Sequence, residues 1–423
     1  MCTPGASHGI WLSVLLFAAF LQTILRSPGT VQLHYELSTM LLLGMFLQTM
    51  EIFYNLQEVG FSIVTSLVVL ALYRFTYMQV LKALPLSFTL GEASIVTQAL
   101  VVFVYNCFLT LPFMNRSKTL NEELSIVLQI GLLAVFIVVL VTYNIPVFRN
   151  WIMFYLLLAV TVSVVCIAPV NGKPAVTILL NFVFNDIERT AIVAVYVVLL
   201  ASAGFAVSWQ ISKNQKGTTS TRKIFHILIV MVFVPGLIYQ CQFLYVASTV
   251  ALAIFVVLET ARVIELYPVA GVLQTSIAAF IDEKDAGKVA LTPIYLLVGC
   301  AAPIWIHNSP CDLTGASAFE LLPLISGVVS IGIGDTFASI IGSRIGRNKW
   351  QNGVKSVEGT LASIVAQAVF IYTLNVLGYL PLTIRLAAIS GVAMISNSLI
   401  EALTDQVDNL VLPIVTYNIL AFK

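Results

Sequence analysis

Charged side chains are scarce in this chain. Asp, Glu, Lys and Arg make up 10% of its 423 residues, whereas 59% of the residues are hydrophobic. A soluble globular domain carries about 25% charged residues, so the composition excludes an ordinary water-soluble enzyme. A single soluble core also stops growing at roughly 250–300 residues, and this much apolar surface therefore needs lipid as its solvent.

The few charges also nearly cancel. The formal net charge is +1, which gives no argument for nucleic-acid binding, and we expect no such partner. The six cysteines show no Cys-x-x-Cys spacing, so neither a zinc site nor a disulfide framework is indicated. We expect them to act as small apolar side chains. No Gly-x-x-x-x-Gly-Lys-Ser/Thr sequence occurs, which excludes an ordinary P-loop.

Apolar stretches of about 20 residues, enough for a helix to cross ~30 Å of hydrocarbon, recur along the chain. The strand alternation of a membrane barrel is absent. The first stretch lacks the basic residue of a signal sequence, and we interpret it as a membrane helix. The sequence therefore predicts an all-α, polytopic transmembrane helical bundle of about 11–14 spans. The expected spans lie near residues 10–25, 37–54, 61–81, 93–113, 124–147, 151–169, 190–210, 224–240, 243–265, 289–307, 319–341, 360–380, 382–402 and 407–421.

Charge divides the chain into two expected regions. Residues 1–210 form an N-terminal transmembrane region in which ionisable residues are sparse and lie mostly at the ends of spans. Residues 211–423 form a transmembrane domain whose charges gather in short loops at 213–223, 282–288 and 343–358.

These three loops are expected on one side of the membrane. Two expected spans separate each loop from the next, and the turns on the opposite side, 240–242 and 307–318, contain no Lys or Arg. The positive-inside rule therefore places the three loops in the cytosol.

The first loop ends in Arg222, Lys223 and His226, at the start of an expected helix. Positions 222 and 223 are neighbours of His226 on the helix surface, and a helix N-terminus favours anions. This arrangement predicts a phosphate clamp, with a simple positive-inside anchor as the alternative. Further along, Glu259 and Arg262 can neutralise each other, or can belong with Glu265 to a stripe of carboxylates.

The segment 332–360 is the most informative part of the chain. Its glycines either allow close helix packing or let the backbone approach phosphate oxygens. Packing does not explain Asp335, an acid within an apolar stretch, which could hold a Mg²⁺ ion that bridges phosphates. Lys355 follows in a polar run and would neutralise charge on a phosphoryl group in transfer.

The last motif contains Glu401, Asp405 and Asp408 at positions i, i+4 and i+7, which stack three carboxylates on one helix face. Like charges at this spacing repel, so the motif calls for a divalent metal or a basic partner loop. Solvated acids at an exposed helix end are the alternative.

Together these motifs resemble the dolichol kinase family, within the wider group of CTP-using membrane kinases. The resemblance covers about residues 210–423, whereas the first half resembles the family only in being polytopic. The matching motifs are Arg222-Lys223-x-x-His226, Glu259-x-x-Arg262, Gly334-Asp335-x-x-Ala338-Ser339-x-x-Gly342-x-x-x-Gly346, Lys355-Ser356-x-Glu358-Gly359-Thr360, and Glu401 with Asp405, Asp408 and Asn409.

The resemblance implies transfer of the terminal phosphate of CTP to dolichol within the bilayer, for protein glycosylation. It also implies a divalent metal, Mg²⁺, and a location in the endoplasmic-reticulum membrane with the nucleotide site facing the cytosol. The implied catalytic residues are Asp335, Lys355, Arg222, Lys223 and His226. The implied nucleotide-binding residues are Gly334, Ser339, Gly342, Gly346, Lys355, Ser356, Glu358, Gly359 and Thr360. The implied metal ligands are Asp335, Glu401, Asp405 and Asp408.

Other functions stay open at this point. The motifs do not distinguish dolichol from phytol or diacylglycerol as the acceptor, and a CDP-lipid synthase would also use CTP and a lipid. A polytopic transporter would show repeated halves with charges near the membrane midplane, whereas these charges lie at one face. The sequence also does not decide which carboxylate binds metal and which acts as a base, because phosphoryl transfer depends mainly on positioning and charge neutralisation.

Overall fold

The computed structural model describes residues 59–116, 119–212, 219–278, 287–307, 320–350, 355–404 and 408–421. Within these ranges the chain is helical apart from short turns and one small hairpin, which confirms the all-α, polytopic class. Seven of the described helices are long and apolar enough to cross a membrane, and several shorter apolar helices accompany them. The expected spans near 10–25 and 37–54 lie outside the described residues.

The chain folds as two compact units, residues 1–113 and 114–423. In the first unit, α3 (Val59–Ala83) packs against α4 (Leu90–Thr110), and the hydroxyl of Tyr73 lies 2.9 Å from that of Ser94. This division comes earlier than residue 210, where the charge pattern places the start of the charged domain. That functional boundary stays a prediction.

Three helices at the start of the second unit follow the expected spans near 124–147, 151–169 and 190–210: α5 (Leu120–Asn144), α6 (Trp151–Ile167) and α8 (Ile187–Ser212). The short helix α7 (Ala175–Phe184) was not expected, and the 3-10 turns η1 (Leu111–Arg116), at the boundary of the two units, and η2 (Pro146–Arg149) precede α5 and α6. A short antiparallel hairpin of β1 (Pro169–Val170) and β2 (Lys173–Pro174) joins α6 to α7. Its turn residues, Asn171 and Gly172, have φ values of 51° and 76°, as a tight Asn-Gly hairpin requires.

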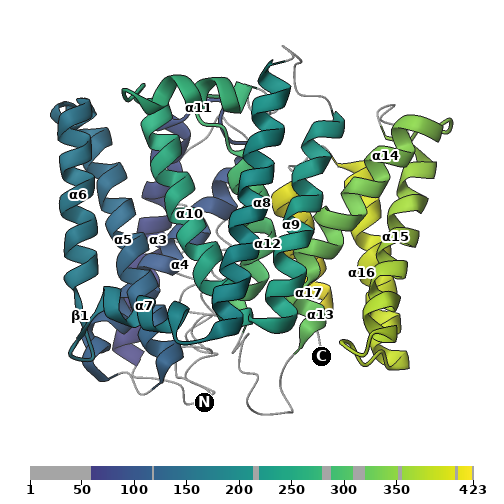
Figure 1. Ribbon diagram of the computed structural model, residues 1–423, viewed down its shortest axis with the longest axis horizontal. Helices are drawn as coiled ribbons and strands as arrows, with labels where there is room; N and C mark the ends of the chain where they lie inside the picture. The colour runs from purple at the N-terminus through teal and green to yellow at the C-terminus, as the bar shows by residue number, and fades with distance from the viewer. Residues whose placement is uncertain are drawn as a thin grey trace. The chain divides into compact units, whose positions relative to one another are not determined.

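The remaining helices carry most of the predicted site residues (Figure 1). They are α9 (Thr219–Tyr239), α10 (Cys241–Val263), α11 (Val269–Ala278), α12 (Thr292–Ile306), α13 (Leu321–Leu324), η3 (Val328–Asp335), α14 (Thr336–Ile345), α15 (Val357–Val376), α16 (Ile384–Leu403) and α17 (Asp408–Leu420). Figure 1 shows α14, α15 and α16 side by side, and these helices also contact one another in chain order.

The centre of this unit is η3, a stretch of wider π-helical turns. It packs against α9, α12, α15, α16 and α17, and its side chains Val328, Val329 and Ile331 are at most 1% exposed. Runs of π-helix are rare and occur frequently at functional sites. Here the π-helix ends at Asp335, which is buried.

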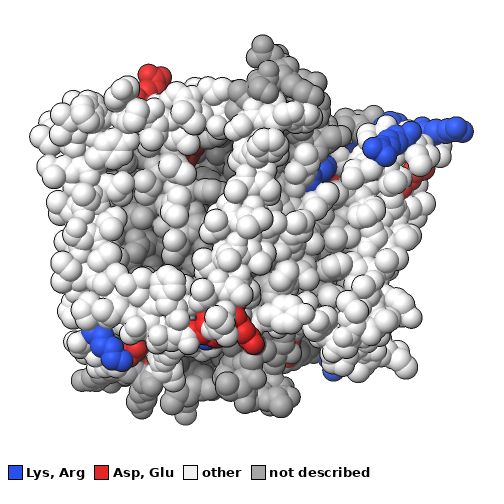
Figure 2. Space-filling view, in the orientation of Figure 1, with Lys and Arg blue, Asp and Glu red and all other residues white. Residues whose placement is uncertain are grey.

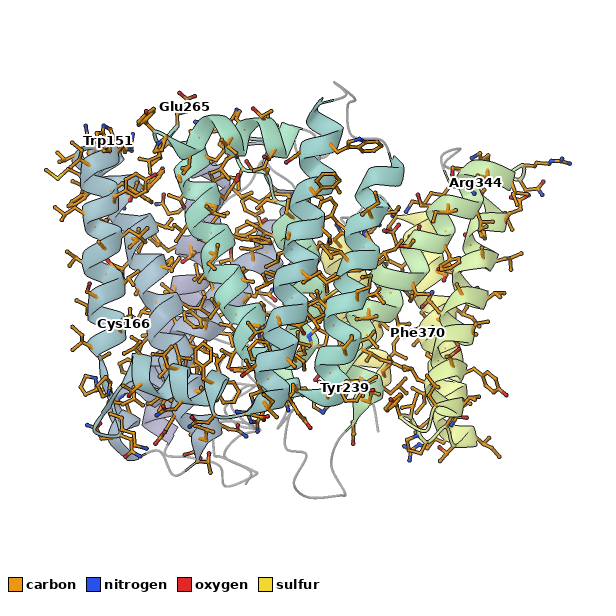
Figure 3. All side chains as sticks on the ribbon, viewed as in Figure 1. Trp151, Cys166, Tyr239, Glu265, Arg344 and Phe370 are labelled. Carbon is orange, nitrogen blue, oxygen red and sulfur yellow. The ribbon has the colours of Figure 1, made fainter. Side chains whose placement is uncertain are left out.

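Several charged residues of the second unit lie at one end of its helices. Figure 3 shows Glu265 and Arg344 at this end, which we call the charged end, and Tyr239 at the opposite end. On the face drawn in Figure 2, the lengths of α8 and α9 are almost free of charged atoms, and Lys and Arg atoms gather near the end of α14. Arg344 belongs to the third charged loop, whereas most of the first two loops lies outside the described residues, so the common side of the three loops stays a prediction.

One expectation about the cysteines is wrong. Cys241, at the start of α10, is disulfide-bonded. Cys300 is free and buried in the apolar core, as expected for a small apolar side chain. Spacing in the sequence gave no signal for the disulfide, because the bond depends on which residues the fold brings to Cys241.

Close packing of η3 makes Gly327 sensitive to substitution. A methyl group at Gly327 would lie 2.5 Å from the carbonyl oxygen of Gly299 and 2.6 Å from the Cα of Cys300. We expect Gly327→Ala to lower the free energy of unfolding by about 1–3 kcal/mol through overpacking. The unfolding temperature of the purified protein in detergent measures this change.

Gly391→Ala is the matched control, because Gly391 is also helical and its added methyl group would meet nothing within 4 Å. We expect this control to be neutral, or stabilising by about 0.5–1 kcal/mol. Equal unfolding temperatures for the two variants would contradict the described packing of η3.

Candidate active site

Asp335 lies in an ionic group with two residues of α9. The ammonium nitrogen of Lys223 is 2.5 Å from Asp335 Oδ2, and His226 Nε2 is 3.2 Å from the same oxygen. All three side chains are largely buried, with 11% exposure for Asp335. A buried carboxylate is costly unless it is paired and hydrogen-bonded, and these two neighbours meet that requirement.

Asn409, in the first turn of α17, completes the surroundings of His226. Its Oδ1 lies 3.3 Å from His226 Nε2, which also faces Asp335 Oδ2. Because both atoms that face Nε2 are oxygens, this nitrogen carries the proton and donates it. Asn409 belongs to the last sequence motif, and the structure shows that it contacts His226.

A second ionic group surrounds Lys355. Its ammonium nitrogen lies 3.5 Å from Glu401 Oε1, 3.4 Å from Asp408 Oδ2 and 2.5 Å from the carbonyl oxygen of Glu401. The acidic motif therefore has the basic partner that its like charges call for. Asp405 lies outside the described residues.

The charge state of Lys355 follows from this setting. Burial lowers the pKa of the Lys355 ammonium, but the carboxylates of Asp408 and Glu401 raise it further, so its pKa lies above the usual value. Lys355 therefore stays positively charged at neutral pH.

The two ionic groups belong to one site at the charged end. The carboxylate of Asp335 also contributes to the raised pKa of the Lys355 ammonium. Asp408 and Asn409 are adjacent on α17, and they contact Lys355 and His226 respectively. Residues from the starts of α9, α15 and α17 and the end of α16 thus meet, and the contact between His226 and Asn409 alone joins residues 183 positions apart.

The glycines after Asp335 hold α14 against the start of α15. A Cβ on Gly346 would lie 2.4 Å from Ser356 Oγ, and a Cβ on Gly359 would lie 2.7 Å from the carbonyl oxygen of Ala338. Gly342 faces the same surface, 3.0 Å from Ser356 Oγ by the same measure. The structure therefore shows the packing role that the sequence left open, and their contact with a nucleotide stays a prediction.

Three polar residues of the predicted nucleotide loop shape its backbone. Ser356 caps α15, because its Oγ accepts a hydrogen bond from the backbone N–H of Gly359 at 3.2 Å. Glu358 accepts hydrogen bonds from the backbone and the side chain of Asn348, at 3.1 and 2.8 Å. Thr360 accepts one from the indole N–H of Trp350 at 3.0 Å.

Two other predicted site residues, Ser339 and Arg222, lie on α14 and α9. Ser339 is half-buried on α14, one turn after Asp335 on the same helix face. Arg222 lies in the first turns of α9 next to Lys223, and its side chain lies outside the described part of the structure.

The Glu259–Arg262 pair is a buried, two-contact ion pair. Arg262 donates to the two carboxylate oxygens of Glu259 at 2.6 and 2.9 Å, and it also donates to the carbonyl oxygen of Lys288 at 2.7 Å. The neutralising interpretation is confirmed. The alternative stripe of carboxylates is wrong, because α10 ends at Val263 and Glu265 leaves the helix with a φ of 56°.

The ammonium groups and carboxylates at this end of the helices are compatible with phosphoryl transfer, which depends on positioning and on charge neutralisation. Comparisons with known proteins agree. A family model described as dolichol kinase matches residues 36–302. The dolichol kinase of Homo sapiens is 33% identical over 378 residues, which cover 84% of this chain and 68% of that protein. The chain therefore belongs to the dolichol kinase family.

Other relatives extend the comparison. The dolichol kinase of Bos taurus is 37% identical over 246 residues, covering 56% of this chain and 45% of the relative. A dolichol kinase of Arabidopsis thaliana is 31% identical over 277 residues, covering 63% of this chain and 46% of the relative. No solved structure matches the chain.

The family match corrects one expectation and sets aside two alternatives. The expectation that the first half resembles the family only in being polytopic is wrong, because the matched region begins at residue 36. A transporter and a CDP-lipid synthase are not supported, since the matching relatives are kinases by name.

The contact between Lys355 and Asp408 can be measured with a double-mutant cycle. We expect Lys355→Met and Asp408→Asn each to lower the free energy of unfolding, because each leaves a partner uncompensated. In the double variant the two losses should be less than additive by about 0.5–3 kcal/mol. The unfolding temperature of the purified protein provides the measurement.

Lys173→Met, at the exposed hairpin between α6 and α7, serves as the control and should change stability by no more than about 0.5 kcal/mol. Strict additivity of the two substitutions would show that Lys355 and Asp408 do not interact.

Proposed function

We propose that this protein transfers the terminal phosphate of CTP to the hydroxyl group of dolichol in the endoplasmic-reticulum membrane. The products are dolichyl phosphate, which serves protein glycosylation, and CDP. The observation that carries this proposal is the convergence of Lys223, His226, Asp335 and Lys355 at the charged end of a membrane-helix bundle. The choice of CTP over ATP rests on likeness to the family.

The proposed mechanism uses the two lysines to neutralise phosphate charge. Phosphoryl transfer requires little covalent help from a protein, and catalysis comes mainly from positioning and from stabilising charge on the transferred group. Lys355 keeps its charge beside two carboxylates, so it can exchange these contacts for phosphate oxygens. The 20-residue helix α15 begins two residues later, and the positive end of its dipole adds to the attraction for phosphate.

Asp335 is proposed to orient the acceptor. Lys223 and His226 both contact Oδ2 of Asp335, so Oδ1 is the oxygen that we assign to the dolichol hydroxyl. A hydrogen bond from the hydroxyl to Oδ1 would aim its oxygen at the terminal phosphate. A strong base is not required in this scheme, because charge neutralisation does most of the work.

A divalent ion is also proposed, with Glu401 and Asp408 as its ligands. An oxygen of each carboxylate lies within 3.5 Å of the same cation, the Lys355 ammonium nitrogen. The two carboxylates are therefore close enough to bind one metal ion together. Among the described residues no three His, Cys, Asp or Glu side chains converge to form a complete cage. Mg²⁺ is commonly bound through one or two carboxylates together with waters and substrate phosphates, to which it would supply positive charge.

The charged end is proposed to face the cytosol. Cys241 lies next to Tyr239, at the end opposite to Arg344, and it is disulfide-bonded. Disulfides persist in the oxidising lumen and are rare in the cytosol. The disulfide and the positive-inside rule therefore support the same orientation.

The activity is tested with purified protein, labelled CTP and dolichol. We expect dolichyl phosphate and CDP as products, and we expect Asp335→Asn to lower turnover at least ~100-fold, because misplaced reacting groups cost about that much. Asp186→Asn, beside Arg189 at the start of α8, should retain turnover. Formation of pyrophosphate instead of CDP, or no phosphorylation of dolichol, would refute the proposed function.

The orientation is tested with single cysteines in sealed microsomes. In a chain whose Cys2, Cys107, Cys166 and Cys300 are replaced by Ala, we expect Arg344→Cys to react with a membrane-impermeant maleimide from outside. Lys173→Cys, in the hairpin at the opposite end, should react only after the membrane is permeabilised. The reverse labelling pattern would contradict the cytosolic site.

A further inference from the structure

A group of polar side chains, which we call the amide network, lies inside α15, α16 and α17. Its members share nearly complete burial within apolar helices: Ser363, Gln367, Asn397, Ser398 and Thr416 are 0–1% exposed. Polar side chains within membrane helices are costly, and they are functional candidates by default. Neither the ionic groups nor the proposed transfer step uses this network.

Gln367 is the centre of the amide network. Its Nε2 donates to Ser363 Oγ at 2.9 Å and to Ser398 Oγ at 3.1 Å, and its Oε1 accepts from Asn397 Nδ2 at 3.5 Å. The Asn397 Oδ1 accepts in turn from Thr416 at 3.3 Å. The side-chain amide of Gln367 is therefore held in one orientation from three sides.

This fixed amide packs against the residue that precedes Asp335. A Cβ on Gly334 would lie 2.8 Å from Gln367 Nε2 and 3.1 Å from Ser363 Oγ. Glycine thus lets the end of η3 rest directly on the amide. Any shift of Gln367 toward or away from Gly334 would move the backbone that carries Asp335.

We infer that Gln367 is a positioning residue, which sets the place of the Asp335 carboxylate between Lys223 and His226 through its contact with Gly334. The inference deepens the proposed kinase function and rests on it. An apolar side chain could fill the same volume, but nothing would fix its orientation. An error of about 1 Å in a reacting group can cost ~100-fold in rate, so positioning at this level matters for turnover.

The test is a double-mutant cycle between Gly334 and Gln367, read as kcat and as KM for the nucleotide. We expect Gly334→Ala to lower kcat by ~10–100-fold at unchanged KM, because its methyl group displaces Asp335. In Gly334→Ala/Gln367→Ala the methyl group has the space that the amide occupied. The double variant should therefore recover to within about threefold of Gln367→Ala, since contacting residues are coupled.

A matched pair of glutamines controls for simple loss of a buried amide. Gln129 in α5 donates to Ser125 at 3.3 Å, the same four-residue spacing by which Gln367 donates to Ser363. We expect Gln367→Met to lower kcat severalfold and Gln129→Met to retain it. The unfolding temperatures of all variants show which of them are folded. If Gln367→Met is not folded, Gln367→Asn replaces it in the comparison.

Two results would overturn the inference. The first is an equally large kcat loss for Gly334→Ala with and without Gln367→Ala. The second is a rise in KM for the nucleotide at constant kcat, which would mean that Gly334 contacts the nucleotide itself. The double-mutant cycle is measured with whichever nucleotide gives product. A donor other than CTP would refute the proposed choice of CTP, and the kinetic coupling between Gly334 and Gln367 could still be measured.

Discussion

The ion pair between Lys223 and Asp335 is the contact on which the candidate site depends. It joins residues 112 positions apart, from the start of α9 and the end of η3, in a largely buried setting. Neither charge would be tolerated alone among apolar helices, so each fixes the location of the other. His226 and Asn409 extend the pair to α17, and α17 carries Asp408 to Lys355. The whole site can thus be traced outward from one contact.

The central position of η3 explains how that contact is held. Gly332 lets α9 approach, since a Cβ there would lie 2.5 Å from Val230 Cγ2, and Gly334 does the same for the amide of Gln367 on α15. The helix that carries Asp335 is therefore located by neighbours on two sides. Packed interiors of this kind permit little displacement, which suits a reaction that depends on positioning.

Much of this architecture could be predicted from the sequence. Long apolar runs locate membrane helices well, as the expected span near 124–147 and the observed α5, Leu120–Asn144, illustrate. The alternation of charged and uncharged loops also predicted the end of the helices at which Arg344 lies. The partners within the site could not be predicted, because they depend on packing between distant helices. The disulfide of Cys241 and the hydrogen bonds of Gln367 were missed for the same reason, although Gln367 is a visibly polar residue within an apolar stretch.

The most direct test of the central claim is a charge exchange between Lys223 and Asp335. If the two side chains form a buried pair, Lys223→Asp and Asp335→Lys should each lower the unfolding temperature strongly, because each leaves two like charges in contact. The exchanged double variant should recover most of the lost stability without turnover, since the carboxylate then lies on α9 and no longer at the end of η3. A double variant that is no more stable than either single variant would show that the two residues are not paired.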